Sequence, residues 1–178
     1  LCTTRLPKYL NTDDSVRTLQ VLSPTKKGVC GVTALNQLLQ EALNPAAPTK
    51  RELQYRDLTL REGDKVIQIK NNYQIPWITP EGEEGLGVFN GDIGFVIHID
   101  EEDKSLTVQF DDLRTVDYEY TQLEEIELAY CLSVHKSQGS EFPAVIIPVI
   151  GGPRMLLTRN LLYTAVTRAR RLVVLVGR

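Results

Sequence analysis

The sequence has few cysteines and no long apolar run. No stretch approaches the roughly 20 apolar residues that a membrane-spanning helix needs. The first ten residues, LCTTRLPKYL, lack the apolar core of a signal peptide. Cys2, Cys30 and Cys131 are odd in number, lie far apart and form no CxxC pair or Cys/His cluster. These features argue against a membrane protein, a disulfide framework and a metal site, and favour a reducing, cytoplasmic setting.

Basic charge is scarce in the middle of the chain. With 178 residues, 42% hydrophobic and 24% charged, the composition fits a single soluble domain or a domain with a small insertion. The net charge of −3 divides into +3 for residues 1–57, −12 for residues 58–127 and +6 for residues 128–178. An acidic segment between basic flanks indicates an inserted module, with any site for a polyanion on the flanks. Uneven surface charge is the plainer alternative.

The first segment is predicted to form a strand, a turn and a helix. Thr18–Leu22 is apolar and β-prone, and Ser23-Pro24 ends it. Residues 32–43 place apolar side chains at helical spacing. Asn44-Pro45 closes that helix, because a residue before proline is pushed out of the α region.

The middle segment is predicted to form a small β-barrel. Four short strands are expected, at Lys65–Ile69, Ile93–Asp100, Ser105–Phe110 and Arg114–Tyr120. The stretch Asn71–Phe89 holds two prolines and three glycines, so it is expected to be a long irregular loop.

The last segment returns to alternating strands and helices. Strands are predicted at Leu128–Val134, Val145–Ile150 and Leu172–Val176, with a helix over Thr158–Arg170. Strands that alternate with helices imply a parallel α/β sheet, here interrupted by the barrel. The expected domains are therefore 1–57 and 123–178 for the α/β part and 58–122 for the barrel.

Two polar clusters follow strands of this predicted sheet, where ligands bind in open α/β folds. Ser133–Phe142, SVHKSQGSEF, contains a cation, hydroxyls, a glycine and a carboxylate, and glycine lets backbone amides approach a phosphate closely. A solvated turn is the alternative. The second cluster is the polar face of the last helix, with Thr164, Thr167 and Arg168 flanked by Arg170 and Arg171, and the rigid charged fork of arginine suits phosphate. Alternatively, these arginines solvate an exposed helix end.

These clusters resemble known motifs. SVHKSQGSEF followed by LLYTAVTRARRLVVLVG resembles motifs V and VI of superfamily 1 helicases, with wording closest to RecD-like enzymes such as the exodeoxyribonuclease V alpha subunit. LQVLSPTKKGVCGVTALNQLLQEALNP resembles motif IV of the same family, and GDKVIQIKNNY with VFNGDIGFV resembles its SH3-like 2B insert. The resemblance implies a RecA-like motor domain 2A with an inserted SH3-like barrel.

The resemblance also implies roles for individual residues. Arg168 of VTRAR would be the catalytic arginine that contacts the γ-phosphate, and Lys27 would reach the same phosphate from motif IV, where related enzymes often have arginine. The nucleotide side of motif V would comprise Gly139 and Glu141. The single-stranded DNA backbone would be contacted by Ser133, His135 and Lys136, although a lone histidine after a strand is more often a hydrogen-bonded turn residue.

No GxxxxGK[ST] loop occurs in the 178 residues. The resemblance therefore implies ATP with Mg²⁺ bound jointly with a missing N-terminal RecA-like domain, and a C-terminal fragment that is inactive alone. It further implies 5′ to 3′ translocation on single-stranded DNA, work in recombination and repair, and subunits of a nuclease complex as possible partners.

Two alternatives stay open. One is a non-catalytic module that binds single-stranded DNA or a protein, with Tyr73 and Trp77 as stacking or docking residues. Local packing would equally explain both aromatic side chains. The other is a different superfamily 1 branch, such as the helicase part of a conjugative relaxase.

Overall fold

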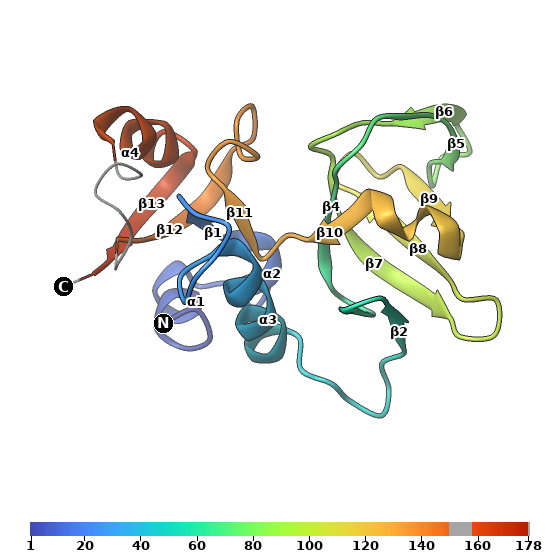
Figure 1. The fold of residues 1–178 in the computed structure, drawn as a ribbon, viewed down its shortest axis with the longest axis horizontal. Coiled ribbons are helices and arrows are strands. Elements are labelled where there is room, and N and C mark those ends of the chain that lie inside the picture. Colours follow the sequence, from blue (N-terminus) through green and yellow to red (C-terminus); the bar gives the residue numbers. More distant parts are fainter. Residues whose placement is uncertain (150–157, 178) are drawn as a thin grey trace. The chain divides into compact units, whose positions relative to one another are not determined.

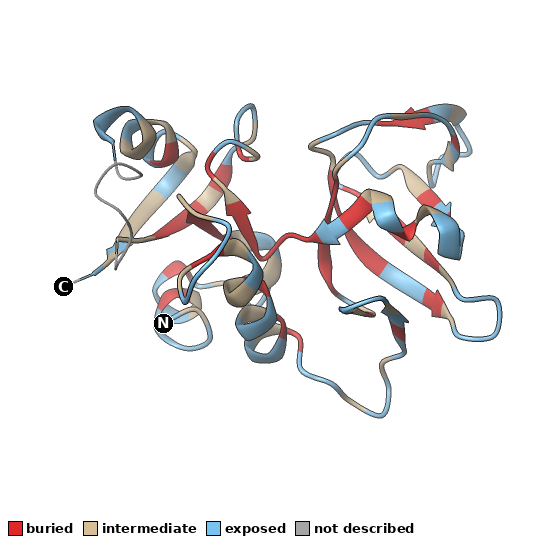
Figure 2. Cartoon of the chain, viewed as in Figure 1, coloured by how far each residue is buried: buried red, intermediate tan, exposed pale blue. Residues whose placement is uncertain are grey.

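Two clusters of strands make up the structure, a computed structural model that describes residues 1–149 and 158–177 (Figure 1). One, the α/β unit, comprises residues 1–45 and 130–178; the other, the β unit, comprises residues 46–129. In each unit, the buried residues concentrate on the central strands (Figure 2). The chain thus enters the β unit from the α/β unit and returns to it, as the sequence predicted for an insertion.

The α/β unit has a four-stranded sheet in the order β11-β1-β12-β13, in which every pairing is parallel. A buried core cluster of Leu6, Leu10, Val21 and Ile146, among others, packs with apolar residues of the helices. The elements of this unit are α1 (Arg5–Leu10), α2 (Ser15–Thr18), β1 (Leu19–Ser23), α3 (Val32–Leu43), β11 (Cys131–Ser133), β12 (Phe142–Pro148), α4 (Arg159–Val166) and β13 (Ala169–Val176).

A buried amide fixes α3 to the outer strand of this sheet. The Asn36 side chain donates from Nδ2 to the carbonyl oxygen of Cys131 at 2.9 Å, and its Oδ1 accepts from the Cys131 backbone N–H at 2.8 Å. Because β11 has a neighbouring strand only on its β1 side among the described residues, Asn36 supplies the hydrogen bonds that a further strand would make.

The β unit is antiparallel. Its main sheet has the order β10-β4-β7-β8-β9-β5-β6, and β2 and β3 form a separate hairpin. Its elements are β2 (Glu52–Tyr55), β3 (Leu58–Arg61), β4 (Lys65–Gln68), β5 (Asn72–Ile78), β6 (Glu84–Val88), β7 (Ile93–Asp100), β8 (Ser105–Phe110), β9 (Thr115–Tyr118), the 3₁₀ helix η1 (Tyr120–Glu125) and β10 (Ile126–Leu128).

The limits of the two units differ from those expected from the sequence. The β unit begins at residue 46 rather than 58 and ends at 129 rather than 122. The β2–β3 hairpin belongs to it because Arg51 Nη1 donates to the carbonyl of Ile99 at 3.1 Å and Glu62 accepts from the Ile99 N–H at 3.0 Å. At the other end, Glu127 of β10 pairs with Ile67 of β4.

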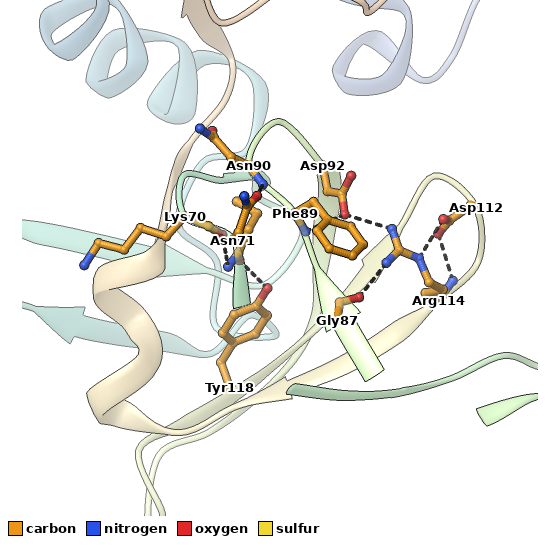
Figure 3. Close-up of polar contacts among 10 residues, drawn as sticks. Lys70, Asn71, Gly87, Phe89, Asn90, Asp92, Asp112, Arg114 and Tyr118 are labelled. Atoms are coloured by element: carbon orange, nitrogen blue, oxygen red, sulfur yellow. Dashed lines mark hydrogen bonds and ion pairs between the residues drawn. The ribbon is translucent and has the colours of Figure 1, made fainter. Parts of the chain in front are cut away.

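An arginine joins three segments of the β unit. Arg114 donates from Nη1 to the Gly87 carbonyl at 2.9 Å, from Nη2 to Asp92 at 2.9 Å and from Nε to Asp112 at 2.6 Å (Figure 3). Both carboxylates raise the pKa of Arg114, against a burial that alone would lower it. Nearby, the buried Tyr118 hydroxyl donates to the side-chain oxygen of Gln68 at 2.6 Å.

Three secondary-structure predictions were wrong. The stretch Asn71–Phe89 is a β-hairpin, β5–β6, rather than a loop. Its Pro76 is tolerated because β5 pairs with β9 only at Ile78, so the missing N–H interrupts no ladder on that side. The predicted strand Leu128–Val134 is two strands, β10 and β11, that belong to different units.

The third error concerns the last helix. α4 ends at Val166 rather than Arg170, because Ala169 already pairs with Phe142 in the sheet. The Phe142 N–H donates to the Arg168 carbonyl at 2.8 Å, which starts this pairing. The strand predicted over Val145–Ile150 is observed as β12, Phe142–Pro148, and Ile150 lies outside the described residues.

Candidate functional site

Two loops leave the sheet of the α/β unit at the same edge. Ser23 and Ser133 are paired at the ends of the parallel strands β1 and β11. Because carboxyl ends of parallel strands share an edge, the loops that follow begin side by side. The first loop carries Lys27, and the second carries His135 and Lys136. Three of the predicted site residues therefore start from one edge.

The loop after β1 is folded tightly onto the start of α3. The Ser23 hydroxyl lies 2.6 Å from the Cys30 carbonyl, to which it donates, and the Val32 N–H donates to the Thr25 carbonyl at 3.0 Å. Any side chain at Gly31 would collide with the backbone of Lys27, since a Cβ there would lie 2.6 Å from the Lys27 carbonyl carbon. The backbone that carries Lys27 is thus fixed by its neighbours.

The loop after β11 begins with a hydrogen-bonded turn. Ser133 Oγ accepts from the Lys136 N–H at 3.2 Å. The buried Ser137 hydroxyl donates to the Val134 carbonyl at 2.6 Å, and the Ser137 N–H lies within hydrogen-bond distance of the Ser133 carbonyl. His135 is exposed. The turn therefore uses the Ser133 hydroxyl for its own structure and leaves the His135 side chain in solvent.

Gly139 and Glu141 lie farther along this loop, toward β12. Gly139 has φ +83°, and a Cβ built on it would meet nothing within 4 Å. Glycine is therefore favoured there by backbone conformation and not by lack of space. The Glu141 carboxylate accepts from Arg170 Nε at 2.9 Å, an ion pair in which both side chains are exposed.

Arg168 lies beside this pair, between α4 and β13. Its Nη1 contacts the Ser140 carbonyl at 3.5 Å, which is a long hydrogen bond. Its Nε is buried and has no hydrogen-bond partner among residues 1–149 and 158–177. Leaving a buried donor unpaired costs about 1–3 kcal/mol. A permanently charged guanidinium with an unmet donor is chemically suited to receive an anion.

The structure divides the predicted site residues between two edges of the sheet. Arg168 and Glu141 flank the starts of β13 and β12, whereas the loops that carry Lys27 and His135 begin at the ends of β1 and β11. The strands between these edges span on the order of 15–20 Å at about 3.3 Å per residue. Lys27 and Arg168 thus start from opposite edges.

Some functional features were not visible in the sequence. The pairing of Arg170 with Glu141 depends on the β12–β13 register, which no local pattern reports. The polar face expected on the last helix is partly used internally, since the Thr164 and Thr167 hydroxyls donate to carbonyls of their own helix at 2.9 Å each.

Three further features of the described residues bear on other kinds of site. Those residues contain no group of three or more His, Cys, Asp or Glu placed to hold a metal ion. No helix among them is long and apolar enough to cross a membrane. Cys2, Cys30 and Cys131 are all free thiols.

Two family models match the chain in the order of its segments. The UvrD-like helicase C-terminal domain matches residues 128–176, and the SH3 domain of ATP-dependent RecD-like DNA helicases matches residues 35–110. The ATP-dependent RecD2 DNA helicase of Deinococcus radiodurans is 37% identical over 152 residues, which cover 85% of this chain and 19% of that protein. The chain belongs to the RecD-like DNA helicase family.

A second RecD-like relative and a solved helicase structure are also similar to this chain. The RecBCD enzyme subunit RecD of Mycobacterium tuberculosis is 35% identical over 102 residues, covering 57% of this chain and 17% of that protein. The chain therefore spans less than a fifth of the length of these two relatives. The crystal structure of a Pif1 helicase from Bacteroides in complex with ADP-AlF3 and ssDNA has a TM-score of 0.57 at 17% identity, over 98% of this chain and 50% of that chain. The fold is thus a RecA-like α/β unit with an inserted SH3-like β unit, which confirms the predicted fold class.

Proposed function

We propose that this RecD-like chain is the second motor domain of an ATP-dependent DNA helicase, and that it senses a nucleotide held by another domain. The observation that carries the proposal is the Arg168 guanidinium, with its buried and unpaired Nε beside Glu141 and the left-handed turn at Gly139. The phosphate-holding loop GxxxxGK[ST] is a motif that these 178 residues do not contain. The chain alone is therefore expected to be inactive.

The residues around Arg168 fit a nucleotide in their chemistry. Arg168 would bind the γ-phosphate, and Gly139 and Glu141 would lie on the nucleotide side. ATP with Mg²⁺ would supply the phosphoanhydride bond whose hydrolysis drives the motor. Arg168 would stabilise the negative charge that develops on the transferred phosphoryl group, the role that an arginine finger performs in related chemistry. Lys27 starts from the opposite edge of the sheet, so its contact with the same phosphate is a separate proposal that requires its own test.

The edge that carries His135 and Lys136 would grip single-stranded DNA. Lys136, with His135 and Ser133 beside it, would contact the phosphate backbone, which makes binding tolerant of sequence and dependent on salt. Two domains that close on ATP and part after hydrolysis would move the protein along the strand. On the family resemblance alone, we further propose that the whole protein moves 5′ to 3′ along the strand and acts in recombination and repair in the cytoplasm. On the same basis, subunits of a nuclease complex are possible partners.

The test uses a longer protein that contains this chain together with a Walker A domain. Arg168→Ala should lower kcat by about 10³-fold or more with little change in KM for ATP, since arginine fingers contribute about 10³–10⁵-fold. Arg168→Lys should also be impaired, because a point charge replaces a fork. The matched control is Arg171→Ala, a neighbouring exposed arginine of β13, which should leave kcat near its original value. Near-normal turnover by Arg168→Ala would refute the assignment.

A further inference from the structure

The β unit has an open groove that the motor function does not use. Strands β5, β6 and β9 line a hollow of about 510 Å³. Its apolar lining includes Pro76, Trp77, Ile78 and Leu86, and Glu84 and Asp117 add two carboxylates. Ile78 and Leu86 are 46% and 63% exposed, which is unusual for large apolar side chains that lie together.

The β5–β6 hairpin that carries the groove is fixed from its opposite face. The Trp77 ring lies on that face, directly on the backbone of Gly85, its partner across β5 and β6, and a Cβ at Gly85 would overlap the ring. The Arg114 guanidinium lies 6.0 Å from the centroid of the Trp77 ring. Arg114 is itself held by the carbonyl and the two carboxylates described above (Figure 3). A hairpin that is already ordered lowers the entropic cost of binding.

The strand beside the groove has an open edge. β6 ends the order of the main sheet, so within the described part of the chain no strand pairs with its outer side. An unpaired edge presents backbone N–H and C=O groups to an added strand. Along an added strand, alternate side chains point to one face with period two. The edge and the groove can therefore act together on one extended segment.

The negative charge around the groove favours an added segment that carries positive charge. Glu83, Glu84 and Asp117 form no ion pair with any residue the structure describes. The nearby cation, Arg114, is already neutralised by Asp92 and Asp112. Residues 46–129 contain 19 Asp and Glu but eight Lys and Arg. This surface attracts basic groups and repels a nucleic-acid backbone.

We infer that this groove binds an extended peptide segment of a partner protein, which presents lysine or arginine and apolar side chains in turn on one face. The peptide backbone pairs with the outer edge of β6. On the face that carries Ile78, Glu84 and Leu86, its apolar side chains contact Leu86 and Ile78 and its basic side chains meet Glu84, while Asp117 adds to the negative charge. This is β-strand addition with side-chain pockets, a recurring mode of peptide recognition. It goes beyond the motor function and does not depend on it.

The experiment titrates the 178-residue chain with a short fluorescent peptide of repeated Lys-Ser-Val-Ser, in which lysine and valine alternate along one face of an extended strand. Ile78→Lys should weaken binding about tenfold, or about 1.4 kcal/mol, because it places a charge in the apolar groove. The matched control is Ile97→Lys in β7, an isoleucine of similar exposure (49%) outside the groove, which adds the same charge and should leave the affinity close to its original value. Gly85→Ala, which displaces the Trp77 ring without any change in charge, should weaken binding as well.

Further measurements separate the outcomes. Glu84→Gln should weaken the peptide more than Glu102→Gln, an equal loss of charge in the turn after β7. NMR shift changes should fall on β5, β6 and β9. Equal effects of Ile78→Lys and Ile97→Lys would show general charge attraction and overturn the inference. Absence of saturable peptide binding, or binding of oligodeoxythymidine that Ile78→Lys alters, would overturn it too.

Discussion

Replacement of Asn36 should destabilise the α/β unit and leave the β unit unchanged. The Asn36 side chain is 7% exposed and makes both of its hydrogen bonds to the backbone of Cys131, which is fully buried. Asn36→Ala removes both bonds and leaves a buried N–H and C=O without these partners. At about 1–3 kcal/mol for each group, less about 0.6 kcal/mol gained in helix propensity, the free energy of unfolding should fall by about 1.4–5.4 kcal/mol.

The composition of the chain allows the two units to be followed separately. The single tryptophan, Trp77, lies in the β unit, whereas the four α-helices seen in residues 1–149 and 158–177 lie in the α/β unit. In urea titrations, Asn36→Ala should therefore move the transition seen by circular dichroism at helical wavelengths and leave the tryptophan fluorescence transition in place. Gln37→Ala, at an exposed position of the same helix, is the control and should change stability by less than about 0.5 kcal/mol. Equal, small effects of both substitutions would show that the Asn36 hydrogen bonds do not hold α3 to β11.

Three single residues, one in each prediction below, give further tests of the structure. Burial raises the pKa of the Cys131 thiol to about 12. At pH 8, iodoacetamide should therefore label this thiol only after unfolding, as measured by mass spectrometry. Because the thiol of the unfolded chain ionises near pH 8.5, the free energy of unfolding should fall as the pH rises from about 8.5 toward 12. Labelling of the native thiol at pH 8 would contradict this. Gly139→Ala should cost about 1–2 kcal/mol in thermal unfolding, because its φ of +83° is unfavourable for a side chain, and Gly139→Asn should cost less; equal costs would argue against a conformational cause. Tyr118→Phe should cost about 1–3 kcal/mol in the fluorescence-detected transition, since it leaves the Gln68 oxygen without the 2.6 Å bond; an unchanged midpoint would show that the bond contributes nothing.

Local periodicity predicted the elements whose pattern is complete within themselves. The helix at residues 32–43 and the strands at Ile93–Asp100 and Ser105–Phe110 have the predicted limits. Each has a full amphipathic or alternating pattern and a clear turn beside it, so no distant partner was needed to identify it.

Elements that depend on a distant partner were predicted poorly. Proline and glycine made Asn71–Phe89 look irregular, but Gly85 is where the Trp77 ring lies, and that contact cannot be read from either residue alone. Similarly, the apolar stripe of the last helix continues past Val166, and only the pairing of Ala169 with Phe142 ends the helix there.

The candidate site was predicted residue by residue but not as an arrangement. The motifs identified Arg168, Glu141 and Lys27 without their relative positions, because those positions follow from strand direction and register. The parallel pairing of β1, β11, β12 and β13 places Lys27 at one edge and the other two at the opposite edge. The ion pair of Glu141 with Arg170 has the same origin.

We propose that this chain senses nucleotide phosphates but does not hold them. Steady-state ATP hydrolysis tests this proposal when it is measured with and without single-stranded DNA, for the 178-residue chain and for a longer protein that adds a Walker A domain. We expect negligible turnover by the chain in both conditions, and turnover by the longer protein that rises with single-stranded DNA. DNA-stimulated hydrolysis by the 178-residue chain alone would contradict it.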